Sequence, residues 1–306
     1  MGNTLAIARR ELGGFFHSAI AYVVMCVFAL LAGLLFMLGV FDSPLPVKEA
    51  SLRPLFRLLI WVLVAIVPAI SMRLISEEMR SGTIEALMTS PVGDGEVVVG
   101  KWLGGFGFYA LLLSPTLVFV LLLAIWGEPD FGPLFTGYLG LLLVGGLFLA
   151  IGTLASVITR NQIIAFLLTV FVILMVSAVP YFLVAAVGRL GDDPVLSGAL
   201  PVRIGAGVAV AVSGIAGALL FGVSRHAMVA VAGTVGALLI SGVLVWLLAV
   251  VEPTVWARVI DYINVLEQFS DFNNGVLTSR NFVFFVSSIV LFLTFAVKVL
   301  ESRKWR

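Results

Sequence analysis

The sequence predicts an all-α polytopic membrane protein, and three observations lead to that fold class. Hydrophobic residues make up 61% of the 306 residues, charged residues make up 11%, and the mean hydropathy is +1.17. Soluble proteins carry roughly 25% charged residues. Because a helix needs about 20 apolar residues to cross a bilayer, the chain holds roughly six to nine spans and little else. We therefore treat residues 1–306 as a single transmembrane domain.

Eight apolar segments have the length of a membrane span. They are residues 20–41, 57–75, 102–126, 134–157, 162–187, 204–223, 227–251 and 282–300. The sixth and seventh are rich in Gly and Ala and are joined by only three residues. Residues 203–251 are therefore either two spans or a re-entrant hairpin. We expect about eight spans, six of them a core and two an extra hairpin.

The distribution of basic residues predicts the orientation, since Lys and Arg favour the cytoplasmic side of short loops. With the amino terminus inside, eleven Lys and Arg residues lie on the inner side and seven on the outer side. The outer segments also carry ten acidic residues, giving −3 outside and +4 inside. We expect both termini in the cytoplasm. The formal net charge of +1 argues against a nucleic-acid partner.

Residues 2–17 predict an amphipathic helix that lies in the inner membrane interface and contacts lipid. Arg10 lies on its polar face, and the opposite face carries Leu5, Ala8, Leu12, Phe15 and Phe16. The alternative is a frayed start of the first span, with a hinge at Gly13 and Gly14. Residues 252–281 are also too polar to span. We expect them to form an extracytoplasmic segment in which Trp256, Tyr262 and Phe269 are interfacial anchors.

Residues 76–100 predict a cytoplasmic segment that begins with a short helix. Glu77 can pair with Arg73 and with Arg80 on one helix face, and the helix should break near Gly82. An apolar edge of Ile84, Leu87 and Met88 follows, and Asp94 can cap the next helix. Pro68, inside the preceding span, is either a hinge above this segment or a harmless bend.

The stretch "GDGEVVVGKW", residues 93–102, contains most of the phosphate-loop pattern G-x-x-x-x-G-K-[ST]. That pattern needs a hydroxyl after the lysine to hold Mg²⁺, and here Trp102 follows Lys101. It also needs a preceding strand in an α/β domain, which this sequence does not predict. We therefore interpret Lys101 and Trp102 as a membrane anchor at the inner leaflet. The G-x-x-x-G spacing of Gly100 and Gly104 would allow close helix packing.

Residues 76–101, "SEEMRSGTIEALMTSPVGDGEVVVGK", resemble the signature segment of ABC-2 type ABC transporter permeases, particularly their gliding-motility-type branch. The matching residues are Glu77, Glu78, Arg80, Ser81, Gly82, Thr83, Glu85, Leu87, Ser90, Pro91, Val92, Glu96, Val98, Gly100 and Lys101. The amino-terminal and carboxy-terminal segments are also similar to that branch. The chain departs from the pattern at Ala19, Gly93 and Gly95, and in the added hairpin of residues 203–251.

The resemblance implies a type V exporter-like transmembrane domain in a bacterial inner membrane, with no catalytic residues and no metal or cofactor of its own. ATP and Mg²⁺ would bind two copies of a separate ABC ATPase. A second copy of this permease, or a related permease, would complete the transporter, and an extracytoplasmic accessory protein is a further candidate partner. The complex would perform export or mechanical work.

In such a permease the segment after the second span is the coupling helix. The resemblance places the ATPase-coupling interface at Glu77, Glu78, Arg80, Ser81, Gly82, Thr83, Glu85, Leu87, Met88, Ser90 and Pro91. The amphipathic helix would brace the same contact. Two alternatives stay open. A secondary transporter would show internal repeats and a mid-membrane charge. An ABC-driven scaffold would transmit motion to an extracytoplasmic partner through residues 252–281 without moving cargo.

Overall fold

A computed structural model describes residues 2–41, 51–83, 92–127, 129–190 and 262–303, with side chains except at residues 20, 39–41 and 178–190. The chain forms two compact units. The first combines Met1–Phe171 with Phe269–Arg306, and the second is Val172–Gln268. All regular elements in the described residues are helices, in agreement with the predicted fold class.

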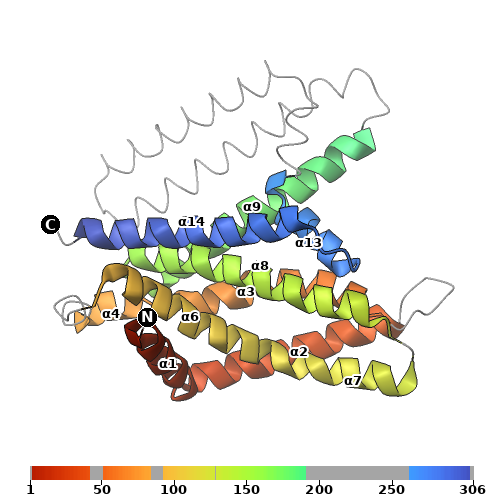
Figure 1. Ribbon diagram of the computed structural model, residues 1–306, viewed down its shortest axis with the longest axis horizontal. Coiled ribbons are helices and arrows are strands. Elements are labelled where there is room, and N and C mark those ends of the chain that lie inside the picture. The colour runs from red at the N-terminus through yellow and green to blue at the C-terminus, as the bar shows by residue number, and fades with distance from the viewer. Residues whose placement is uncertain (1, 42–50, 84–91, 128, 191–261, 304–306) are drawn as a thin grey trace. The chain divides into compact units, whose positions relative to one another are not determined.

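Figure 1 shows the helices in chain order. The first unit contains α1 (Gly2–Phe16), α2 (Ala19–Phe41), α3 (Arg53–Ser71), α4 (Ser76–Ser81), α6 (Asp94–Leu113), the 3-10 turn η1 (Ser114–Thr116), α7 (Leu117–Trp126), α8 (Phe131–Ile158) and α14 (Ser279–Arg303). Two further helices, α9 (Gln162–Leu190) and α13 (Val265–Asn273), each begin in one unit and end in the other.

Within the described residues, five helical stretches are long and apolar enough to cross a membrane. They are Ala21–Leu38, Arg53–Ser81, Asp94–Trp126, Phe131–Ile158 and Ser279–Arg303. These correspond to the first four predicted spans and the last one, and α9 covers the fifth. The predicted hairpin of residues 203–251 lies outside the described residues, so the count of eight spans stays a prediction. The third span starts earlier than expected, at Asp94, and is interrupted by η1 at Pro115.

Helix α8 packs against α3, α6 and α14, and its glycines permit close approach. A Cβ atom at Gly137 would lie 2.5 Å from the Phe56 ring of α3. Likewise, Gly145 leaves room for the ring of Tyr109, whose hydroxyl donates to the Leu141 carbonyl at 2.6 Å. Small residues at helix contacts have this effect in membrane proteins generally. The α8 contact surface therefore fixes the positions of α3 and α6.

The position of Phe269 in α13 contradicts the prediction made for it from the sequence. Phe269 is not an interfacial anchor, because it is buried and its ring would contact a Cβ atom at Gly140 of α8. Nearby, Thr136 of α8 donates a hydrogen bond to the Phe272 carbonyl at 2.6 Å. Burial of Phe269 against α8 therefore outweighs any preference of its ring for the bilayer surface. Tyr262 is exposed. Trp256 and most of the predicted extracytoplasmic segment lie outside the described residues.

Candidate functional site

The connection between α3 and α4 is fastened to α8 by one hydroxyl. Ser156 Oγ accepts hydrogen bonds from the amides of Ile75 at 3.0 Å and Ser76 at 2.9 Å, and donates to the Met72 carbonyl at 3.3 Å. It thereby satisfies two amides at the start of α4 that no preceding turn can satisfy. Helix α3 continues past Pro68 to Ser71, so the helix does not end at that proline. Its role as a hinge stays a hypothesis.

Helix α4 ends where the sequence predicts. Gly82 has φ +77°, the left-handed conformation that glycine adopts readily at a helix end. Ser81 Oγ lies 3.0 Å from the Glu77 carbonyl oxygen and 2.8 Å from Thr83 Oγ1. Glu77 and Arg80 are exposed, so α4 presents both charge signs on its free face. Glu85, Leu87, Met88, Ser90 and Pro91, together with Ile84, lie outside the described residues.

Helix α1 packs directly on α6 at the G-x-x-x-G pair. A Cβ atom at Gly100 would lie 2.9 Å from Ile7 Cβ, and one at Gly104 would lie 2.6 Å from Glu11 Cβ. Both distances are shorter than ordinary carbon contacts of about 3.5–4.0 Å. The predicted close packing is therefore confirmed, and its partner is the amino-terminal helix (Figure 1).

The buried face of α1 differs in part from the predicted one. Ala8 and Phe15 are buried and Leu12 and Phe16 are partly buried, as expected, but Leu5 is 70% exposed. Ile7 is buried in its place. The packing on α6 selects this face, whereas the hydrophobic period alone selects the most apolar one. A position in the membrane interface stays a prediction for α1.

Three helices meet at a cluster of four charged residues. Lys101 Nζ of α6 lies 2.8 Å from Glu11 Oε1 of α1 and 2.8 Å from Glu78 Oε1 of α4. Arg10 Nη2 reaches the same two oxygens at 3.2 and 3.4 Å. The Lys101 side chain is only 1% exposed, whereas that of Arg10 is 59% exposed. The cluster therefore contains a buried cation, an exposed cation and two carboxylates.

This geometry corrects the prediction that Lys101 is a membrane anchor. A side chain that is 1% exposed and paired with two carboxylates cannot also reach lipid headgroups. Nor is its backbone a phosphate loop, since residues 94–113 form one helix. Trp102 Nε1 donates to the Gly146 carbonyl at 3.1 Å, and the indole stacks on Phe106. An anchoring role for Trp102 stays a prediction.

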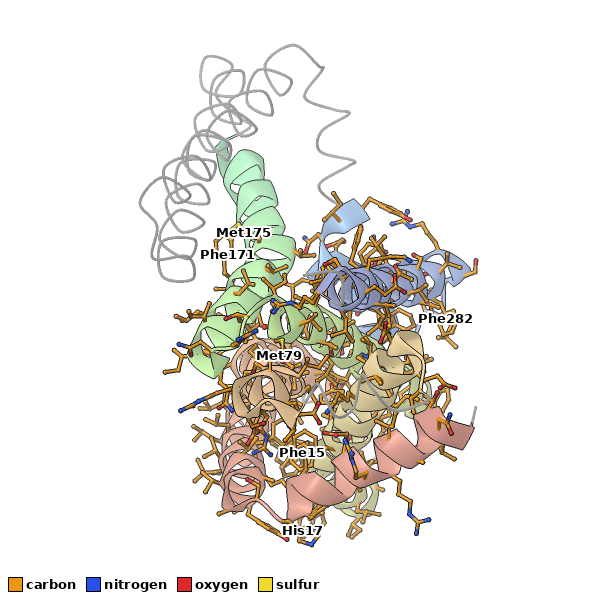
Figure 2. The ribbon with its side chains drawn as sticks, turned by 90° about the vertical axis from the view of Figure 1, so that its left-hand side faces the viewer. Phe15, His17, Met79, Phe171, Met175 and Phe282 are labelled. Atoms are coloured by element: carbon orange, nitrogen blue, oxygen red, sulfur yellow. The ribbon has the colours of Figure 1, made fainter. Side chains whose placement is uncertain are left out.

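Further polar contacts hold α1 in place. Asn3 Nδ2 lies 3.3 Å from Glu96 Oε2, which also accepts a bond from the Gly93 amide. The prediction that Asp94 caps this helix is wrong by one residue, because Gly93 is the N-cap and Asp94 is the first residue of α6. Glu96 accepts the bond from the Gly93 amide. At the other end of α1, Arg73 lies 4.8 Å from the centre of the Phe15 ring, which Figure 2 labels.

A polar cleft of about 240 Å³ opens beside this contact. It is lined by Glu11, Gly14, Phe15, Ser18, Arg73, Leu74 and Glu77. Arg73 donates to Ser18 Oγ at 3.0 Å from one side of the cleft. The carboxyl groups of Glu11 and Glu77 contribute the opposite charge. The cleft therefore lies between α1 and the start of α4, next to the charge cluster.

The apolar helices and the buried charge cluster define a multi-pass helical membrane protein with a polar assembly at one end of its spans. A profile of the family described as "ABC-2 family transporter protein" matches residues 17–177, which is more than half of the chain. The chain therefore belongs to the ABC-2 transporter family, the membrane permease components of ABC transporters. The match includes α4 and Lys101. A search of curated proteins finds no match.

Proposed function

We propose that this chain is a permease subunit that couples ATP hydrolysis by a separate ABC ATPase to export or to mechanical work across the membrane. Membership of the ABC-2 family supports a permease that works with such an ATPase. In this proposal ATP and Mg²⁺ bind the ATPase, two copies of which dock on two permease subunits. The transporter lies in a bacterial inner membrane with both termini of the permease in the cytoplasm. The resemblance of residues 76–101 to the gliding-motility-type branch suggests that subgroup.

The main support for the proposal is the attachment of α4 to the membrane helices α8 and α6. A coupling element must present side chains to a partner, and it must also be joined firmly to the membrane helices that it moves. Helix α4 exposes Glu77 and Arg80 on one side. On the other side it is bonded to α8 through Ser156 and to α6 through Lys101. Both requirements are met within six residues.

The amino-terminal helix supports the same interpretation. Its contact with α6 places Glu11 and Arg10 next to Glu78 of α4. Phe15 stacks on Phe108 of α6, with ring centres 4.6 Å apart. We propose that α1 braces α4 when the ATPase docks, and that Leu12 and Phe16 contribute to the same surface.

Co-purification tests the proposal. The tagged full chain is co-expressed with an ABC ATPase of the same cell and purified in mild detergent. We expect the ATPase in the wild-type complex and its loss with Leu87→Asp or Met88→Asp, because a carboxylate on the apolar edge cannot be buried against a partner without a large desolvation cost. Ser302→Asp, at the exposed carboxy-terminal end of α14, adds the same charge elsewhere and should retain the ATPase.

The outcomes also separate the alternatives. If no ATPase accompanies the wild-type chain, or if both aspartate variants retain it, the proposed coupling is wrong. Transport by the chain alone in liposomes would favour a secondary transporter. ATPase binding without movement of any cargo, combined with an extracytoplasmic protein that binds residues 252–281, would favour the scaffold.

A further inference from the structure

Lys101 joins three helices that are distant in sequence. We propose that Lys101 is a positioning residue that fastens α4 to α1 and α6, so that the start of the cytoplasmic segment and the amino-terminal helix move as one body. The functional meaning of this inference rests on the proposed function, since a shared motion matters only if an ATPase acts on α4. The attachment itself is testable on the permease alone.

Helix α4 needs external contacts to hold its direction. It has only six residues, and an isolated helix of that length is unstable in water. Its first amides are held by Ser156, and its side is held through Glu78 by Lys101. A single attachment at the start of α4 would leave the helix free to swing. The attachment at Glu78 restricts that motion, together with the buried side chain of Met79 on the same helix.

The same ammonium also holds α1. Glu11 Oε1 and Glu78 Oε1 come from different helices, and each lies 2.8 Å from Lys101 Nζ. The two carboxylates therefore share one buried cation. Without it only the exposed guanidinium of Arg10 would offset the repulsion between the two carboxylates. The second oxygen of Glu78 is buried and has no hydrogen-bond partner among the residues that the structure describes. Glu78 thus depends strongly on the bonds to its other oxygen.

Arg10 provides a matched comparison. Its guanidinium contacts the same two oxygens, but at 3.2 and 3.4 Å and with a 59% exposed side chain. Exposed ion pairs contribute little because water and salt screen them, whereas removing one partner of a buried pair is strongly destabilising. Substitution of Lys101 should therefore release α4 from α1, and substitution of Arg10 should not.

The test measures the distance between α1 and α4 in the full chain. Cys26 is replaced by serine, and spin labels are attached to cysteines at the exposed positions Arg9 and Arg80. In lipid nanodiscs we expect one narrow distance distribution by pulsed EPR. Lys101→Met should broaden it, and Arg10→Ala should leave it narrow.

A double variant that exchanges the charges of Lys101 and Glu78 distinguishes loss of this ion pair from a general loss of packing. Lys101→Glu combined with Glu78→Lys places the shared cation on α4, where it can bond to the carboxylates of α1 and α6. We expect this double variant to restore the narrow distribution, which a general loss of packing would not do. A Lys101→Met protein that keeps the narrow distribution would overturn the inference.

If Lys101→Met does not fold, the labels at positions 9 and 80 in the protein that keeps Lys101 provide a second test. In the complex with the ATPase, the distance between the two labels should be the same with and without trapped nucleotide. A nucleotide-dependent change in that distance would show that α1 and α4 move separately, and the inference would be wrong. Absence of any ATPase complex would contradict the proposed function instead. The EPR measurement in nanodiscs would then still decide whether Lys101 holds α4 to α1.

Discussion

Substitution of Gly104 by alanine should loosen the amino-terminal helix. The added Cβ would lie 2.6 Å from Glu11 Cβ and 3.0 Å from the Ala8 carbonyl oxygen. Both atoms belong to or adjoin the backbone of α1, so no rotamer change relieves the clash and the helix must shift. Overpacking of this kind costs about 1–3 kcal/mol. Alanine regains up to about 1 kcal/mol through its higher helix propensity.

Taking the middle of the overpacking range, about 2 kcal/mol, the net cost is about 1–2 kcal/mol. That cost corresponds to a change of about 5–30-fold in an opening equilibrium. Cysteine labelling measures that equilibrium at Ile7, which is 8% exposed in the contact with α6. In a Cys26→Ser, Ile7→Cys background, we expect maleimide to label the Gly104→Ala protein about 5–30 times faster than its Gly104 parent.

Gly107→Ala is the matched control. Its Cβ would lie 3.5 Å from Leu12 Cδ1, an ordinary contact, and it gains the same helix propensity in the same helix. Labelling of this variant should therefore be as slow as in its parent, or slower. If the two alanine variants label at equal rates, the contact between α1 and α6 is not as close as the structure shows.

Two further substitutions test the attachment of α4. Ser156→Ala removes the hydroxyl that accepts hydrogen bonds from two amides at the start of α4. The detergent-solubilised protein should lose about 1–3 kcal/mol of folding free energy and melt at a lower temperature. Ser287→Ala is the control, because this hydroxyl bonds within its own helix, and it should melt like wild type. Gly82→Ala forces a φ of +77° on a residue with a Cβ at a cost of about 1–2 kcal/mol. Trypsin should then cut faster after Arg80 than in Gly95→Ala, whose added Cβ meets nothing within 4 Å; equal cleavage rates would contradict the capping role.

Features that depend only on neighbouring residues, such as helix ends and apolar segments, could be predicted from the sequence. The break of α4 at Gly82 follows from glycine conformation and is confirmed. Helix-end chemistry also located the start of α6 to within one residue, since the N-cap is Gly93 and not Asp94. The same holds for the apolar helices, since hydropathy over about 20 residues is a property of one segment. The resemblance of residues 76–101 likewise pointed to the family that the profile match shows.

The partners of Lys101 could not be predicted in this way. Its position after a glycine-rich pattern suggested a phosphate loop, and its place near a span suggested a lipid anchor. Glu11 and Glu78 lie 90 and 23 positions away, and only the packing of α1 on α6 brings Glu11 to the ammonium. The bonding of Ser156 to α4 spans 80 positions and had no sequence signal.

The sequence by itself thus determined the five described stretches that are apolar enough to span, and where α4 breaks. Tertiary structure alone decided which face of α1 is buried, why Phe269 faces α8, and how residues 93–102 pack against α1 and α4. The physical reason is the range of the interactions. Hydropathy and helix ends depend on adjacent residues, whereas burial of an ammonium depends on which distant carboxylates the helix packing delivers to it.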